Sequence, residues 1–233
     1  MRYYVSINGV SSLTKNGLAI KELPPISKPS IRTNTETIDG RDGDIVTRLG
    51  YSAYDKTIEI GLFGNYDIDD IISYFNQSGE IIFSNEDDKY YRFEILNQID
   101  FDKLVKFRTA NVVFHCQPFK YEVGETPVTL SSGNNTVTNK GNIYAKPILN
   151  IEGTGTISVS LNGNQVFSID MSNTSEITID IEKLEAYDPN DNTLLNRIVT
   201  GDYDDFKLNS GSNTINLSGT ITSANISMYS RWL

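Results

Sequence analysis

The side chains that could most readily take part in catalysis are the single histidine of the chain, His115, and its single cysteine, Cys116. Nucleophilic catalysis needs a thiol or hydroxyl within hydrogen-bond reach of a base. Both residues lie in a segment expected to be a β-strand, where successive side chains point to opposite faces, so they cannot pair within one chain. A serine triad would need His115 as well, and no Gly-x-Ser-x-Gly elbow is present. We therefore predict an ordinary buried Cys116 and no catalytic residue.

Acidic turns raise the question of a metal site. The run 188–192 (Asp-Pro-Asn-Asp-Asn) is similar to the opening of a calcium loop, but Thr193 stands where glycine is needed and Val199 where glutamate is needed. The run 39–44 fails the same test. We interpret both runs as solvated turns and predict no metal and no cofactor. A weak calcium alternative in the C-terminal half rests on Asp202, Asp204 and Asp205.

Sugar chemistry leaves one candidate site. With 30 acidic residues, some pair of carboxylates will always lie at the distance that a glycosidase needs. The sequence does not single out any one pair as catalytic. Sugar binding without catalysis needs exposed aromatic faces, which Tyr187 and Tyr203 offer in expected loops. Phe167, Tyr229 and Trp232 fit better as core or strand residues. Tyr187 and Tyr203 are thus candidate glycan contacts.

Charge and composition limit the possible partners. The 233 residues carry a net charge of −10, shared equally between residues 1–130 and 131–233, which disfavours sequence-independent binding of nucleic acid. No run of 18 apolar residues and no signal-peptide pattern occurs, so we expect no membrane span. One cysteine allows no internal disulfide. We expect the chain to fold in a reducing cytoplasm.

Short strands and one helix are expected in a first domain over residues 1–130. Apolar residues at 68, 71, 72 and 75 form one helical stripe, and Asp67 can cap it, which predicts a helix over about 67–77. Alternating or bounded apolar segments predict strands at 3–7, 56–62, 80–84, 89–96 and 107–117, the last ending at Pro118.

The segment from Lys21 to Tyr51 has a different character. It has several prolines, no strong period, and the Asp-Gly-Arg-Asp-Gly-Asp run at 39–44. A stretch of this length without a clear element is unusual inside a compact domain and usually marks a functional loop or arm. We predict an arm over about 21–51.

The composition changes after residue 130, where Ser, Thr and Asn account for 39 of the 103 remaining residues. We expect a linker at 131–145 and a second domain at 146–233. Strands at 157–161 and 165–169 flank Asn162-Gly163, the strongest hairpin signal in the chain. Further short strands are expected at 178–181, 213–217 and 218–229. Regular short strands with polar turns indicate a β-sandwich.

The order of these motifs resembles the distal tail protein family of long-tailed siphophages. The resemblance rests on Asp39-Gly-Arg-Asp-Gly43, the strand at 56–62, the short helix and residues 107–119. It continues through 139–163 (NKGNIYAKPILNIEGTGTISVSLNG) to the closing SMYSRWL of 227–233. It implies a mainly β protein, with a sandwich or barrel-like N-terminal domain carrying one short helix and a long arm. A galectin-like or carbohydrate-binding-like β-sandwich follows.

The resemblance also implies a role. Distal tail proteins form a hexameric ring between the tail tube and the tail-tip or baseplate proteins, and an arm contributes to ring closure. The matching ring-assembly residues here are Gly40, Arg41, Asp42 and Gly43. Implied partners are further copies of the chain, the tail tube protein, and hub, lysin or receptor-binding proteins. DNA would pass through the ring without specific binding.

Three functions remain open on the sequence. The first is a virion structural protein at the distal end of the tail, present in the host cytoplasm during assembly. The second is a carbohydrate-binding tail-tip module that recognises a cell-wall sugar. The third, a cell-wall enzyme, is kept for comparison, and we expect that the protein is not an enzyme.

Overall fold

The computed structural model describes residues 2–96 and 98–233 and divides into two compact units. The first unit is Met1–Val123 with Leu233, and the second is Gly124–Trp232. Each unit has its own cluster of buried apolar side chains. Among the described residues, no helix is long and apolar enough to cross a membrane.

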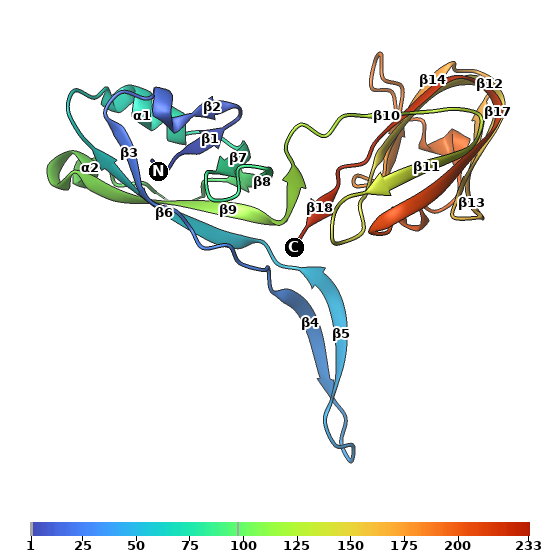
Figure 1. Ribbon diagram of the computed structural model, residues 1–233. Coiled ribbons are helices and arrows are strands. Elements are labelled where there is room, and N and C mark those ends of the chain that lie inside the picture. Colours follow the sequence, from blue (N-terminus) through green and yellow to red (C-terminus); the bar gives the residue numbers. More distant parts are fainter. Residues whose placement is uncertain (1, 97) are drawn as a thin grey trace. The chain divides into compact units, whose positions relative to one another are not determined.

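The elements of the first unit are β1 (Val5–Ile7), β2 (Val10–Ser11), η1 (Ser12–Thr14), β3 (Leu18–Glu22), β4 (Ile31–Thr37), β5 (Asp44–Tyr51), β6 (Tyr54–Leu62), α1 (Ile68–Phe75), β7 (Gly79–Phe83), β8 (Lys89–Glu94), α2 (Phe101–Phe107) and β9 (Thr109–Glu122). An antiparallel sheet runs in the order β2-β1-β7-β8-β9-β6-β3, whereas β4 and β5 form a separate two-stranded sheet (Figure 1).

Helix α1 forms where the apolar stripe predicts it. The carboxylate of Asp67 accepts hydrogen bonds from the backbone N–H groups of Asp69 and Asp70, which satisfies two free donors of the first turn. The helix buries Ile71 and Phe75 on the sheet side. It ends at Phe75, close to the expected end near residue 77.

Helix α2 was not predicted. It has seven residues and buries Leu104, whereas Val105 and Phe107 are exposed, so its sequence shows no apolar stripe. Asp100 caps its start by accepting a hydrogen bond from Lys103 N. Arg108 ends it in a left-handed conformation (φ 59°), and β9 begins at the next residue.

Strand β9 continues through Pro118, where the sequence predicted its end. The pairing with β6 stops at Cys116, and the pairing with β8 skips from Cys116 to Lys120. Pro118 therefore lies in a bulge where no N–H group is needed for the ladder, which is a position that tolerates proline.

The elements of the second unit are β10 (Val128–Leu130), β11 (Gly133–Asn139), β12 (Ile148–Leu161), β13 (Asn164–Met171), β14 (Glu176–Asp180), β15 (Glu185–Tyr187), η2 (Asn196–Ile198), β16 (Val199–Thr200), η3 (Tyr203–Asp205), β17 (Gly211–Ser227) and β18 (Arg231–Trp232). The mainly β fold that the sequence predicted is confirmed.

Two long bent strands build the second unit. The first half of β12 pairs with β14 and its second half with β13, while β17 pairs with β11 at one end and β10 at the other (Figure 1). The bend needs glycine, because a Cβ on Gly153 would lie 2.4 Å from Thr220 O and one on Gly219 2.6 Å from Thr156 O. The two expected strands at 213–217 and 218–229 are therefore one strand.

The stretch 131–145, expected as a linker, contains β11. Its seven residues pair with β17 from Gly133↔Leu217 to Asn139↔Gly211, and Val137 and Asn139 are buried. The polar composition of β11 reflects a strand with one exposed face, and composition alone does not distinguish such a strand from a linker.

The core of the first unit is centred on Phe114. Its ring lies 5.2 Å from the Phe93 ring centroid, 5.9 Å from that of Phe83 and 6.4 Å from that of Phe75. These contacts join β9 to β7, β8 and α1, so one side chain links four elements.

We predict that Phe114→Ala lowers the free energy of unfolding of the first unit by about 3–5 kcal/mol, because it leaves a cavity among packed rings. The matched control is Phe107→Ala, whose ring is 61% exposed and should cost less than about 0.5 kcal/mol. Denaturant unfolding followed by circular dichroism measures both values. Equal losses in the two variants would contradict this account of the core.

Candidate assembly surface

The β4–β5 hairpin occupies the region that the sequence predicted as an arm. Its strands pair from Ile31↔Tyr51 to Thr37↔Asp44, with a bulge between Arg32 and Thr33. Within the described residues, neither strand pairs with any other strand. Both outer edges therefore carry backbone N–H and C=O groups that no neighbouring strand satisfies, which is the usual template for pairing with another chain.

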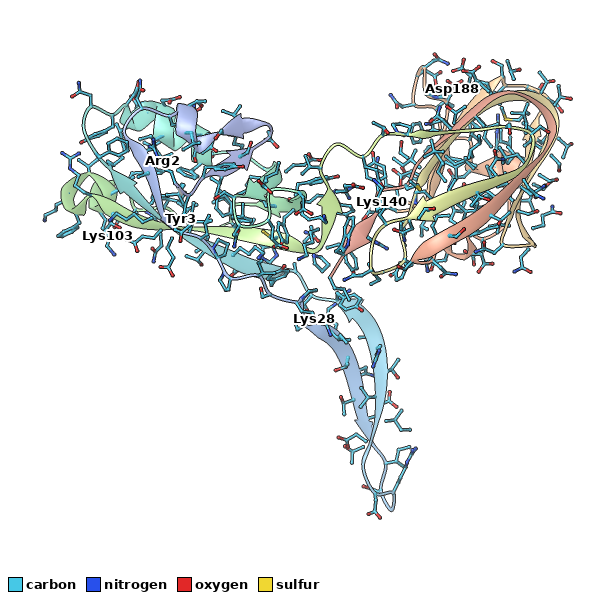
Figure 2. All side chains as sticks on the ribbon, viewed as in Figure 1. Arg2, Tyr3, Lys28, Lys103, Lys140 and Asp188 are labelled. Atoms are coloured by element: carbon cyan, nitrogen blue, oxygen red, sulfur yellow. The ribbon has the colours of Figure 1, made fainter. Side chains whose placement is uncertain are left out.

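Apolar side chains lie exposed on the same hairpin. Ile38, Val46 and Leu49 have exposed fractions of 46%, 58% and 57%. Figure 2 shows the side chains of the hairpin pointing away from both of its faces. An isolated two-stranded hairpin is marginally stable in water, so a hairpin of this length gains stability from a covering surface.

The four predicted ring-assembly residues form the hairpin turn between β4 and β5. Gly40 and Gly43 both have positive φ (81° and 77°), a conformation that glycine adopts without strain. Arg41 donates its backbone N–H to Ile38 O at 3.1 Å, and the side chains of Arg41 and Asp42 are exposed. The prediction placed these residues together, and their role in a ring stays a prediction.

The root of the arm is fixed by side chains of the first unit. Lys56 Nζ donates to Pro25 O at 3.1 Å, and Asn85 Nδ2 donates to Pro24 O at 3.0 Å. The two ends of the hairpin meet where the N–H of Ser52 donates to Ser30 O at 2.9 Å. The segment that leads into β4 is therefore held against the sheet.

Lys56 is the least expected member of this root, because it lies in a strand and is only 2% exposed. Its ammonium lies 4.6 Å from the ring centroid of Tyr91 and 5.4 Å from that of Tyr54. Burial lowers the pKa of Lys56 from its usual value. The rings and the Pro25 carbonyl partly replace the water that the charge has lost.

A second polar contact supports this lysine. Tyr91 donates its hydroxyl to Glu86 Oε2 at 2.7 Å, and Glu86 Oε1 pairs with the buried Lys120. Burial raises the pKa of Tyr54 to about 12, so its hydroxyl stays neutral beside Lys56. The sequence analysis missed this cluster. The signal available was a lysine in register with Ile58 and Ile60 on the buried face of β6.

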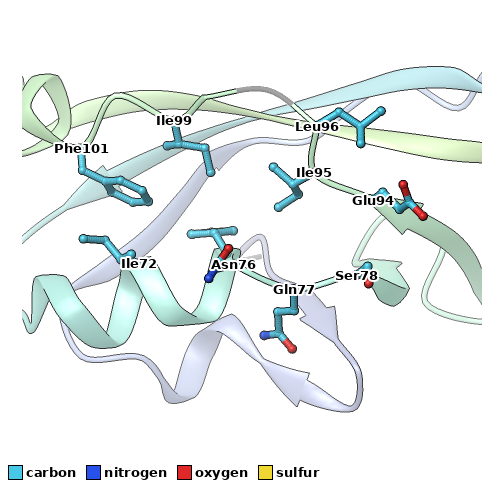
Figure 3. Close-up of a pocket in the computed structure, with 10 residues that line it drawn as sticks. Ile72, Asn76, Gln77, Ser78, Glu94, Ile95, Leu96, Ile99 and Phe101 are labelled. Atoms are coloured by element: carbon cyan, nitrogen blue, oxygen red, sulfur yellow. The ribbon is translucent and has the colours of Figure 1, made fainter.

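A pocket of about 470 Å³ with both apolar and polar lining residues lies between α1 and the segment after β8 (Figure 3). Ile72, Ile95, Ile99 and Phe101 line it from two sides, and Gln77 lies at its rim. Among its described lining residues, Glu94 is the one titratable side chain, and no nucleophile lies next to a base.

His115 and Cys116 point to opposite sides of β9, as the strand periodicity predicts. Cys116 is fully buried, and burial raises the pKa of its thiol to about 12. His115 is partly exposed, and its Nδ1 lies 2.8 Å from Asp55 Oδ1 on the neighbouring strand. The two side chains therefore do not form a nucleophile and base pair.

The two tyrosines proposed as glycan contacts have different surroundings. Tyr203 packs edge to face on the buried Phe167 with ring centroids 5.4 Å apart, and its hydroxyl is buried. Tyr203 is otherwise partly exposed, and its role as a glycan contact stays a prediction. Tyr187 is partly exposed in β15, directly opposite Thr178 of β14.

The acidic run at 188–192 forms turns. The carboxylate of Asp188 accepts the N–H of Asn190 at 2.8 Å, and that of Asp191 accepts the N–H of Thr193 at 2.8 Å. Figure 2 labels Asp188 in the second unit. Among the residues that the structure describes, no group of three or more His, Cys, Asp or Glu could hold a metal ion.

The first unit contains a match to a family of phage tail proteins. Residues 10–116 match the family model described as the phage tail protein RIFT-related domain. This stretch contains the arm, its root and most of the sheet. The match confirms the resemblance to siphophage tail proteins that the order of motifs indicated.

The fold of the whole chain is similar to that of the Dit protein of phage SPP1, described as a paradigm of the hub adsorption apparatus in phages that infect Gram-positive bacteria. The similarity has a TM-score of 0.66 and 18% identity and covers 97% of this chain and 98% of that one. Two structures of the phage p2 baseplate in its activated conformation, with strontium and with calcium, match more weakly. Their TM-scores are 0.49 and 0.47 at 11% identity, over 97% of both chains. No curated protein matches.

We predict that Lys56→Met loosens the arm root without unfolding the unit. The free energy of unfolding should change by less than about 1 kcal/mol, because an apolar isostere also removes the cost of burying a charge. Hydrogen exchange of the Ser52 amide should become about tenfold faster. Lys21→Met, which removes an exposed ion pair with Glu59, is the control and should leave that exchange unchanged. Unaltered exchange in Lys56→Met would show that the lysine does not hold the root.

We predict that Cys116 is inert in the folded protein. With a thiol pKa raised to about 12, roughly one molecule in a thousand carries the thiolate at pH 9, where an ordinary cysteine is largely ionised. Ellman's reagent should therefore find no thiol at pH 8–9 in buffer and one thiol in guanidinium. Rapid labelling of the native protein would contradict the burial.

Proposed function

We propose that this protein is a structural component of a phage tail that forms a closed ring at the distal end of the tail. The observation that carries the proposal is the β4–β5 hairpin, which presents two unpaired edges and three exposed apolar side chains. A hairpin of this kind is explained when a second surface covers it.

A second copy of the chain is the surface that the family match favours. Identical subunits close into a ring when one patch of each subunit contacts a different patch of the next, with a rotation that returns to the start. A protruding hairpin and a separate acceptor surface meet that condition. Pairing of a hairpin edge with a strand of the neighbour adds backbone hydrogen bonds and fixes the register. Six copies, as the resemblance implies, is the number we propose.

The fixed root supports the same reading. Ring closure depends on the direction of the hairpin, since a small angular error at each subunit adds up around the ring. The contacts of Lys56, Asn85 and Ser52 hold the segment before β4 and the end of β5. A flexible linker would give no such direction.

The partners we propose are those of a junction: the tail tube protein on one side, and hub, lysin or receptor-binding proteins on the other. The net charge of −10 fits a channel through which DNA slides without being bound. The similarity to a hub protein of an adsorption apparatus supports a virion location, with assembly in the host cytoplasm. We propose no catalytic role.

We predict that replacing residues 31–51 by Gly-Ser-Gly yields a folded monomer that cannot form the ring. The short link suffices because the Ser52 N–H already lies 2.9 Å from Ser30 O. Native mass spectrometry and light scattering across protein concentrations, with and without the tail tube protein, measure the oligomer. A ring that persists without the hairpin would overturn the proposal.

A double substitution tests the hairpin contact without shortening the chain. Val46→Ser with Leu49→Ser should lower the ring population at a fixed concentration and leave the fold intact. The control is Leu13→Ser, because Leu13 is 45% exposed in the same unit but outside the hairpin. Equal effects of the two sets would show that general surface polarity, and not the hairpin, sets the oligomeric state.

A further inference from the structure

Two exposed phenylalanine rings lie at the same end of the sheet of the first unit. Phe63 directly follows β6, and Phe107 is the last residue of α2. The N–H of Leu62 donates to Arg108 O at 3.3 Å, so the residues on either side of this bond are neighbours at the end of the β6–β9 pair. Phe63 and Phe107 are 51% and 61% exposed, and Val105 of α2 is 41% exposed. The sheet therefore ends in an apolar surface that is open to solvent.

Cationic side chains lie over and beside these rings. The guanidinium of Arg2 lies 5.5 Å from the ring centroid of Phe63, and the ammonium of Lys106 lies 5.5 Å from that of Phe107. Lys103 is exposed on the same helix, and Figure 2 labels it and Arg2 in this part of the first unit. We call the following side chains the α2 surface: Arg2, Phe63, Lys103, Val105, Lys106 and Phe107.

The charge of the α2 surface is opposite in sign to that of the whole chain. Residues 100–108 carry three cations and two carboxylates, and Arg2 adds a fourth cation, whereas the chain has a net charge of −10. One of the two carboxylates, that of Asp100, accepts the backbone N–H of Lys103 at 2.8 Å. A local excess of cations beside exposed rings favours a partner segment that is acidic and partly apolar.

The turn of the β4–β5 hairpin has this complementary composition. Residues 36–44 (ETIDGRDGD) carry four carboxylates and one arginine, which gives a net charge of −3. Ile38 within this stretch is 46% exposed, and Val46 just after it is 58% exposed. The hairpin turn and the α2 surface therefore match in charge, and both present apolar side chains.

The hairpin and the α2 surface lie at opposite ends of one strand pair. Strand β6 follows the hairpin along the chain and pairs with β9 from Tyr54↔Cys116 on the hairpin side to Gly61↔Thr109 on the α2 side. The nine residues of β6 separate the two ends by roughly 26 Å. Figure 1 shows the hairpin leading away from α2. Two different surfaces at opposite ends of a subunit are the arrangement that head-to-tail contacts require.

We infer that the α2 surface of one copy receives the hairpin turn of the next copy. In this contact Lys103 and Lys106 face the carboxylates of residues 36–44, and Ile38 and Val46 pack against the phenylalanine rings. Like charges at this position would oppose docking, so the contact also selects the direction of assembly. The inference rests on the ring proposed above and identifies the acceptor surface, which the family resemblance leaves open.

The test is a charge-reversal cycle on the full chain. Lys103→Glu with Lys106→Glu reverses the charge of the α2 surface, and Asp39→Lys with Asp42→Lys reverses that of the turn. Each pair alone brings like charges together and should raise the protein concentration at half assembly by at least about tenfold. All four substitutions in one chain should return this concentration to within about threefold of the unmodified value. Native mass spectrometry and light scattering, with and without the tail tube protein, measure assembly.

Lys183→Glu with Arg197→Glu is the matched control, because it makes the same charge change at exposed positions of the second unit and should leave assembly unchanged. Circular dichroism checks that every variant is folded. An α2 reversal that acts no more strongly than the control, or a fourfold variant that stays dissociated, would overturn the inference. If removal of residues 31–51 still abolishes the ring, the ring proposal itself stands. An unmodified chain that forms no ring in either condition would overturn both.

Discussion

The proposed assembly depends on a hairpin whose outer edges pair with no other described strand and whose Ile38, Val46 and Leu49 side chains are exposed. A two-stranded ribbon has no core of its own, and each of its strands has one side of the ladder left open. Such a feature is unfavourable in a protein that acts alone and favourable in one that assembles. The hairpin lies within residues 10–116, the stretch that matches the phage tail RIFT-related domain.

A hairpin without contacts at its root would have no fixed direction. For assembly, the contacts at the root therefore matter as much as the exposed surface of the hairpin. Burying the ammonium of Lys56 is costly, and the structure offsets the cost with aromatic faces and the Pro25 carbonyl. The same residue thereby links β6 to the segment that enters the arm. A methionine would pack there as well, but it could not hold the carbonyl, which indicates that the lysine serves direction more than stability.

Local signals in the sequence predicted much of the fold. Asn162-Gly163 marked a hairpin, Asp67 marked the start of α1, and the alternation of residues 56–62 marked β6. The missed features depend on distant residues. The course of β17 through Gly219 is fixed by the Thr156 carbonyl, and the burial of Lys56 by rings from β7 and β8. The packing of Tyr203 on the Phe167 ring was also not predicted, because its loop position gave no sign of that ring.

The central claim is that another copy of the chain covers the hairpin. Its most direct measurement is hydrogen–deuterium exchange of the β4 and β5 amides, recorded on the monomer and on the assembled oligomer of the same preparation. Edge amides of the hairpin should exchange rapidly in the monomer and become protected in the oligomer, while the amides of β12 stay the same in both. An oligomer whose hairpin amides exchange as rapidly as those of the monomer would contradict the account.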